Sequence, residues 1–187
     1  PTAAVAFMSV GPKAAAFAAF FRIVLMAAGY AGASFLVVLW VIAALTMTVG
    51  NVGAIQQTNI KRMLAYSSIA HAGYILVALV AAQGSGAMAT AGFLYYVLVY
   101  AFMNIGAFCV VVIAGENEGE RTLIEDYAGM GYTRPALAAI MAIFMVSLAG
   151  LPPMGGFVAK FYIFSAAIKA GYVWLVVLAV LNSVISV

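Results

Sequence analysis

The sequence predicts an all-α, polytopic membrane protein. Of its 187 residues, 67% are hydrophobic and only 7% are charged, whereas globular domains carry about 25% charged residues. The apolar residues occur in long blocks that do not alternate, and this pattern favours helices over a β-barrel. The same composition excludes a soluble enzyme. The net charge of +3 is spread over loops and spans and gives no basic face for nucleic acid.

Apolar segments that can cross a membrane follow one another along the chain, and their ends are predicted to within a few residues. About six such segments cover residues 2–28, 35–58, 63–82, 89–114, 135–169 and 172–187. The chain begins at Pro1 without an initiator methionine and stops inside an apolar run. We therefore expect a fragment of a longer protein, with its last helix cut short.

The fifth segment is too long for one straight span, because about 20 residues cross a bilayer core. In its middle, Pro152 and Pro153 each lack a backbone N–H donor, and the glycines around them loosen the chain. The sequence therefore predicts a helix over residues 135–149, a break, and a second helix over residues 157–169.

The basic residues of the loops predict the orientation. The second-to-third turn and the 115–134 loop lie on one side, which carries Lys61, Arg62, Arg121 and Arg134; the opposite side has only Arg22 and Lys169. The positive-inside rule places the more basic side in the cytoplasm.

The 115–134 loop has a helix-start pattern. Thr122 and Glu125 have the spacing of a capping box. Leu123, Tyr127 and Met130 would then share one face of a short helix at the membrane interface. A solvated loop is the alternative.

Two lysines fall near the middle of their segments. Lys13 directly follows Pro12, which disrupts the local hydrogen-bond ladder, and Lys160 lies one turn beyond the break. A charge at the bilayer centre costs at least about 2.5–3.5 kcal/mol on insertion scales. We interpret both lysines as functional. The alternative for Lys13 is a side chain that snorkels to an interface.

A histidine lies at a similar depth in the third segment. His71 shares a helical face with Ser67, four residues earlier, and Tyr74, three residues later. These side chains form a polar strip that suits a proton relay, although a lone histidine is often a packing residue. A metal site is not predicted, because Cys109 is the only cysteine and no other ligands accompany His71.

Other polar residues in the spans are interpreted as contacts between helices. Tyr96, Tyr100 and Asn104 follow at steps of four in the fourth segment. This stripe suits hydrogen bonding between helices, with a water wire as the alternative. Thr48 and Asn51 in the second segment are interpreted in the same way.

The chemistry that these residues allow is proton transfer. Desolvation disfavours the charged form of a buried lysine, so small electrostatic changes can load or unload it. Two lysines with a histidine between them can pass a proton along bridging waters. The sequence shows no nucleophile–base pair and no paired carboxylates in the spans, so we expect no bond-making catalysis here.

Three stretches resemble a known family. They are residues 9–18 (SVGPKAAAFA), 50–74 (GNVGAIQQTNIKRMLAYSSIAHAGY) and 147–162 (SLAGLPPMGGFVAKFY). All three are similar to the N-subunit family, antiporter-like membrane subunits of NADH:quinone oxidoreductase (respiratory complex I). The resemblance extends over essentially the whole chain. Lys160 favours this family over the related M subunits and D-type antiporter subunits, in which glutamate is expected at this position.

The resemblance implies a fold of 14 transmembrane helices built on inverted repeats. Residues 1–28 would end the first repeat, and residues 35–187 would form most of the second, within a single transmembrane domain. It also implies a proton path through Lys13, His71 and Lys160. The family's glutamate and first buried lysine would lie upstream of this chain.

The resemblance implies a function for the whole complex. The protein would be a proton-translocating subunit of a translocase in the bacterial inner membrane, beside other complex I membrane subunits. Flavin mononucleotide, iron–sulfur clusters and quinone would bind in partner subunits, with no cofactor in this chain. The alternatives are a subunit of a multisubunit cation/proton antiporter or of a membrane-bound hydrogenase-type complex, and a scaffold that transports nothing.

Overall fold

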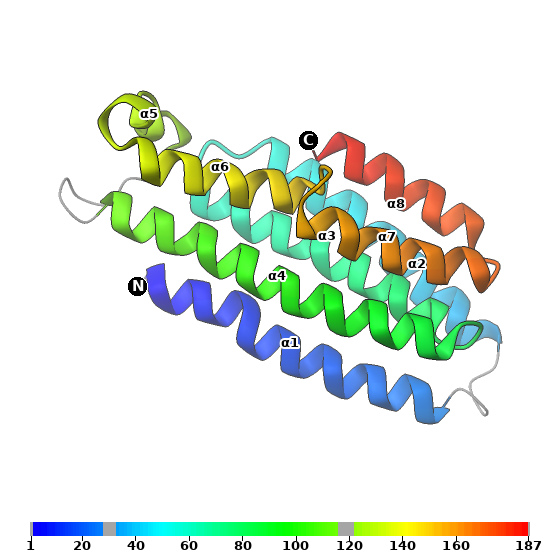
Figure 1. The fold of residues 1–187 in the computed structure, drawn as a ribbon. Helices are drawn as coiled ribbons and strands as arrows, with labels where there is room; N and C mark the ends of the chain where they lie inside the picture. The colour runs from blue at the N-terminus through cyan, green and yellow to red at the C-terminus, as the bar shows by residue number, and fades with distance from the viewer. Residues whose placement is uncertain (1, 28–32, 116–121, 187) are drawn as a thin grey trace.

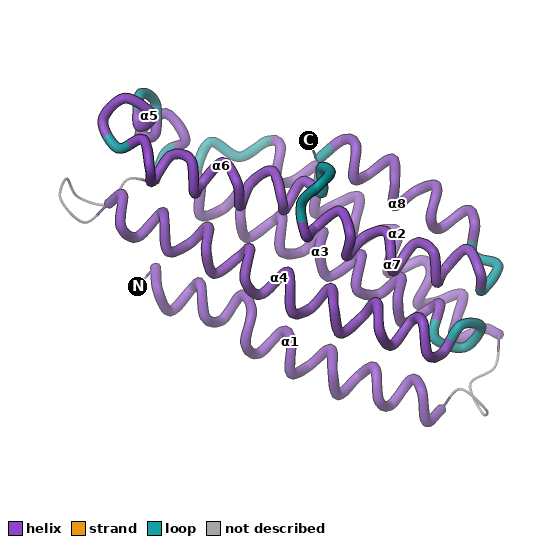
Figure 2. Tube along the Cα trace, viewed as in Figure 1, coloured by secondary structure: helices purple, strands orange, loops and turns teal. Residues whose placement is uncertain are grey.

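The computed structural model describes residues 2–27, 33–115 and 122–186, which form a bundle of helices lying roughly along one direction (Figure 1). The elements are α1 (Thr2–Ala27), α2 (Ala33–Ile55), α3 (Ile60–Ala81), α4 (Gly86–Gly115), the 3-10 helix η1 (Ile124–Tyr127), α5 (Met130–Thr133), α6 (Pro135–Ala149), α7 (Gly155–Lys169) and α8 (Val173–Ile185). Within the described ranges, turns and loops join successive helices (Figure 2).

The bundle has the dimensions and composition of a membrane domain. Within the described residues, 4 helices are long and apolar enough to cross a bilayer, namely α1 to α4. Helices α6 and α8 are shorter but also apolar, and the short α7 carries Lys160 and Lys169. The prediction of an all-helical membrane bundle is therefore confirmed, and the helix ends lie within a few residues of the predicted ones.

Helix α3 lies at the centre of the bundle. It contacts α1, α2, α4, α7 and α8, and every residue from 73 to 82 is buried. Helix α2 packs most closely against it, because a Cβ at Gly50 would meet the backbone of Ala70. Small residues at such crossings let two backbones approach each other in a membrane.

The predicted break lies between α6 and α7, which follow one another alongside α4 (Figure 1). Helix α6 ends at Ala149, and Gly150 has a φ of 87°, which favours glycine. Pro152 and Pro153 lie exposed in the break. Helix α7 begins at Gly155, earlier than predicted, because Gly155 and Gly156 already adopt helical geometry after Met154.

Proline does not interrupt α1. The helix runs from Thr2 to Ala27 with Pro12 inside it, and Pro12 is exposed at the bundle surface. The helix is therefore continuous at Lys13, unlike the α6–α7 segment, which is broken at Pro152 and Pro153.

The α2–α3 turn and the loop before α6 lie at the same end of the bundle, as the orientation argument requires. Ile60 N donates to Thr122 O at 2.9 Å, and Ile124 N donates to Thr58 O at 2.9 Å. An antiparallel bridge pairs Asn59 with Leu123. The acidic residues Glu116, Glu118 and Glu120 and the basic Arg121 lie outside the described residues.

The predicted capping box and interfacial helix are wrong in detail. Asp126, and not Glu125, turns back to the helix start, where its Oδ2 accepts from the N–H groups of Thr122 and Leu123. Leu123 belongs to the extended bridge and precedes the 3-10 helix. Met130 is buried at the start of a separate helix, so the predicted common face does not form.

Candidate functional site

Polar side chains gather inside the bundle without carboxylates. The chain's 5 acidic residues all fall within residues 116–126, outside the long apolar helices. Uncharged hydroxyl and carbonyl groups must therefore satisfy the ammonium groups of Lys13, which is half-buried, and of Lys160, which is buried. The buried polar residues are Asn51, Ser68, His71, Asn104, Ser147, Lys160 and Asn182.

Lys13 crosses from α1 to α3. Its Nζ donates to Ser68 O at 2.6 Å and to Ser68 Oγ at 2.8 Å, and it lies 5.9 Å from the centre of the Tyr100 ring. Ser68 belongs to the turn of α3 that leads to His71. The hydroxyl partner of Lys13 is thus Ser68, which the sequence did not single out.

His71 is held by tyrosines from two helices. The side chain is only 3% exposed, and its Nδ1 lies 2.6 Å from Tyr96 Oη on α4. The Tyr74 and Tyr100 rings lie 5.9 Å and 5.0 Å from the imidazole, between ring centres. Tyr96 thus makes the contact between helices that the sequence predicted, joining α4 to α3, and its partner is the candidate relay histidine.

Asn104, the third member of the Tyr96–Tyr100–Asn104 stripe, does join helices. Its Nδ2 donates to Ser9 Oγ at 2.6 Å, which connects α4 to α1. Tyr96 and Asn104 therefore both join α4 to neighbouring helices, and Tyr96 does so at the candidate relay histidine.

Lys160 is bound at the helix break. Its Nζ donates to Ala149 O at 2.7 Å and to Ser183 Oγ at 2.8 Å, and it lies 4.9 Å from the centre of the Tyr74 ring. Ala149 is the last residue of α6, so no following helical turn occupies its carbonyl. The break therefore supplies a backbone acceptor for the buried ammonium group.

An amide network joins α2 to α8 beside this lysine. Asn51 Nδ2 donates to Asn182 O at 2.9 Å and to Tyr74 Oη at 3.4 Å. Asn182 Nδ2 donates to Thr48 Oγ1 at 3.2 Å. Thr48 and Asn51 thus make the contacts between helices that the sequence predicted.

Two site residues on α8 were not predicted. Asn182 and Ser183 contact Asn51 and Lys160, respectively. The signal was present in the sequence, because with Ser186 they are the polar interruptions of an otherwise apolar helix.

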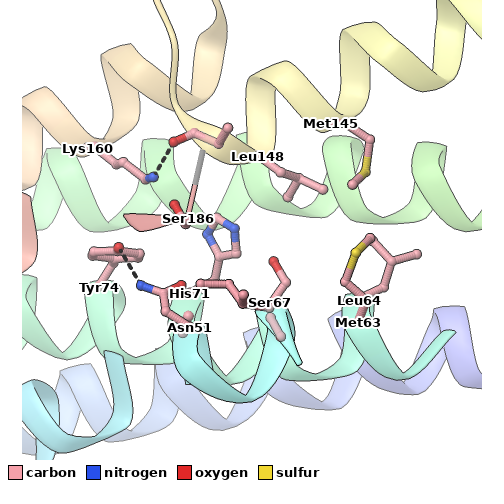
Figure 3. A pocket seen from close by; sticks show the side chains of 14 residues that line it. Asn51, Met63, Leu64, Ser67, His71, Tyr74, Met145, Leu148, Lys160 and Ser186 are labelled. Carbon is pink, nitrogen blue, oxygen red and sulfur yellow. Dashed lines mark hydrogen bonds between the residues drawn. The ribbon is translucent and has the colours of Figure 1, made fainter. Parts of the chain in front are cut away.

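A cavity connects the surroundings of His71 with those of Lys160 (Figure 3). Its volume is about 130 Å³, and one water molecule needs about 10–15 Å³ by the same measure. Polar side chains from α2, α3 and α7, and from the residue that follows α8, line it; they are Asn51, Ser67, His71, Tyr74, Lys160 and Ser186. The structure therefore brings His71 and Lys160 to one cavity, while Lys13 reaches α3 through Ser68.

These features describe an antiporter-like membrane protein: apolar spans, a broken helix, and a half-buried and a buried lysine on either side of a buried histidine. The chain belongs to the family described as NADH:quinone oxidoreductase/Mrp antiporter, transmembrane, whose model matches residues 1–186.

Individual relatives agree with this assignment. NADH-quinone oxidoreductase subunit N of Trichlorobacter lovleyi is 54% identical over 100% of this chain and 38% of its own length. Respiratory complex I from Thermus thermophilus contains a chain that matches with a TM-score of 0.82 and 36% identity, over 100% of this chain and 39% of that one. A chain of the Mrp complex from Dietzia matches with a TM-score of 0.80 and 27% identity, over 91% and 31%.

The predicted resemblance to the N-subunit family is confirmed. The chain spans 38% of the length of the Trichlorobacter relative. Together with the apolar helices, these matches confirm an integral, multi-pass membrane protein. Among the described residues, no three His, Cys, Asp or Glu side chains come together to hold a metal ion.

Proposed function

We propose that this chain is part of a proton-translocating membrane-arm subunit of NADH:quinone oxidoreductase. It would comprise the last helix of one repeat (residues 1–28) and most of the next (35–187) in a 14-helix inverted-repeat fold. In this arrangement α6 and α7 together make one broken span, so six spans are present. The 54% identical N subunit and the matching complex I chain support the proposal.

Protons would move along Lys13, His71 and Lys160. Lys13 would receive the proton, His71 would bridge, and Lys160 would release it towards the non-cytoplasmic side. Two observations support this order. Lys13 donates a hydrogen bond to Ser68, which lies one turn before His71 on the same helix, and His71 and Lys160 line the same cavity. Lysine, histidine and bridging water are groups that can exchange protons at membrane depth.

The energy would come from redox chemistry elsewhere in the complex. Flavin mononucleotide, iron–sulfur clusters and quinone would bind in partner subunits, and this chain would contact neighbouring antiporter-like subunits in the bilayer. The relatives come from bacteria, which supports a location in the bacterial inner membrane.

Replacing Lys13 by methionine tests the proposal. In the complete protein within its assembled complex, we expect NADH-driven proton uptake into sealed vesicles to fall about 10²-fold, at the low end of what a positioned acid–base group contributes. Arg22→Met is the matched control, because Arg22 is an exposed cation on the same helix. Normal uptake by an assembled Lys13→Met complex would favour the non-transporting scaffold.

A second candidate is a subunit of a cation/proton antiporter that needs no dehydrogenase. The match to the Mrp complex chain favours it. It predicts proton movement that follows sodium in the absence of NADH. If the pH inside the vesicles changes only when NADH is added, at every sodium concentration, the antiporter candidate is wrong and the complex I proposal stands.

A further inference from the structure

We propose that Tyr96 is a positioning residue for His71, which fixes the imidazole so that it exchanges protons only at Nε2. This inference rests on the proposed relay and names a residue that the relay had not included. Under this proposal, Nε2 of His71 both takes up the proton that comes from Lys13 and releases it towards Lys160.

The bond between Tyr96 and His71 is short and shielded from water. Tyr96 Oη lies 2.6 Å from His71 Nδ1, and the two residues are only 1% and 3% exposed. A hydrogen bond inside a protein is electrostatically stronger than one in water. A phenol oxygen can accept a hydrogen bond from an N–H group. It can therefore bind Nδ1–H both when the His71 imidazole is neutral and when it is protonated.

Neighbouring rings restrict the imidazole. Tyr74 approaches it edge-on at an interplanar angle of 67°, and Tyr100 lies at 5.0 Å with an angle of 37°. The two tyrosines come from α3 and α4, and both are buried. A ring flip, which would put Cδ2 in the place of Nδ1 and Cε1 in the place of Nε2, would have to displace packed aromatic side chains as well as break the Tyr96 bond.

The cavity determines what the other nitrogen faces. His71 lines the cavity together with Lys160, whereas Tyr96 is not among the lining residues. With Nδ1 directed to Tyr96, the remaining nitrogen is left for the cavity. The Tyr96 hydroxyl can donate to Nδ1 or accept from it, and in the state that takes up a proton from the cavity Nε2 is unprotonated and Nδ1–H donates to Tyr96 Oη.

The proton balance then follows. A proton delivered to Nε2 gives an imidazolium ion whose Nδ1–H remains bonded to Tyr96. Loss of the proton from Nε2 restores the starting tautomer, with no proton released at Nδ1. Without the Tyr96 oxygen, Nδ1 loses its hydrogen-bond partner at 2.6 Å, and protons can then exchange at Nδ1 as well as at Nε2.

Tyr96→Phe tests this role, because it removes one oxygen and keeps the ring. In the complete protein within its assembled complex, we expect NADH-driven proton uptake to fall about tenfold, equivalent to about 1.4 kcal/mol of barrier. Because proton transfer at His71 would then limit the rate, the solvent deuterium isotope effect on turnover should increase. A loss that came only from looser packing would leave the isotope effect unchanged.

Tyr95→Phe is the matched control. Tyr95 is the preceding residue and is 37% exposed, and its ring centre lies 5.8 Å from that of the exposed Tyr162, with the two rings tilted by 49°. The same chemical change there should leave uptake and isotope effect at parental values.

His71→Gln separates failure of this inference from failure of the relay. If His71→Gln abolishes uptake while Tyr96→Phe behaves as the parent, the positioning role is wrong and the relay stands. If His71→Gln assembles and pumps normally, the relay through His71 is wrong, and the role of Tyr96 falls with it.

Discussion

Lys160→Met in the complete, assembled complex is expected to abolish coupled proton transport. Methionine has a similar length but no exchangeable proton, so the last group of the proposed relay is lost. We expect uptake and NADH-driven turnover to fall about 10²-fold or more, the range that positioned acid–base groups contribute. Turnover and proton uptake in sealed vesicles measure the two effects together.

The fold is expected to survive this substitution. Removing the ammonium group takes a donor from Ala149 O, and an unsatisfied buried carbonyl costs about 1–3 kcal/mol. Ser183 Oγ already lies 3.5 Å from the same oxygen and can donate to it instead. Removal of a buried cation that has no carboxylate partner also relieves its desolvation cost. The amount of assembled complex, measured after solubilisation, should therefore remain close to that of the parent.

Two further variants decide what Lys160 contributes. Lys160→Arg keeps the charge, but an arginine side chain stays protonated, so transport should be lost as in Lys160→Met. Lys169→Met removes an exposed lysine from the end of the same helix and should change nothing. Recovery of pumping in Lys160→Arg would show that Lys160 supplies a fixed charge, and the proposed release of a proton from it would be wrong.

The sequence was sufficient to locate the break and the buried cations. Proline has no N–H to donate, and an apolar run longer than one bilayer crossing has to be interrupted. Local chemistry therefore placed the end of α6 at Ala149 without information from other helices. The depth of Lys160 followed from the rise of a helix, because each residue adds about 1.5 Å.

The partners of the buried groups could not be predicted in the same way. Spacing along α3 identified Ser67 and Tyr74 as neighbours of His71, but which serine meets Lys13 depends on where α1 packs. Successive residues on a helix differ in direction by about 100°, so Ser67 lines the cavity while Ser68 contacts Lys13. Contacts between distant segments, such as Lys160 with Ser183, carry no local signal of pairing.

The loop before α6 shows the converse failure. Its helix-start pattern was real, because an acidic side chain does turn back to the start of a short helix at Thr122 and Leu123. The pairing of Leu123 with Asn59 shifted that start by one residue, and a tertiary contact thereby overrode the local preference.

Gly156→Ala is expected to cause the largest loss of stability. A Cβ at Gly156 would overlap Ser147 O, a backbone atom of α6 that cannot move without shifting the helix. Gly156 N also donates to Ser147 Oγ at 3.3 Å, a bond that ties the start of α7 to α6. Overpacking a tight site typically costs about 1–3 kcal/mol, sometimes more. We expect a lower midpoint of thermal unfolding and less assembled complex.

The neighbouring Gly155→Ala is the matched control, since the two glycines differ in what a methyl group would meet. At Gly155 the nearest atom is Val99 Cγ1 at 3.2 Å, the tip of a side chain that can shift by a few tenths of an ångström. Gly155→Ala should therefore unfold close to the parental temperature. Equal stability of the two variants would show that α6 and α7 do not depend on close backbone contact at Gly156. The hydrogen bond from Lys160 on α7 to Ala149 O on α6 spans the same two helices. A Gly156→Ala protein that still assembles should therefore also transport protons more slowly, because a shift of α7 relative to α6 would displace Lys160 from this acceptor.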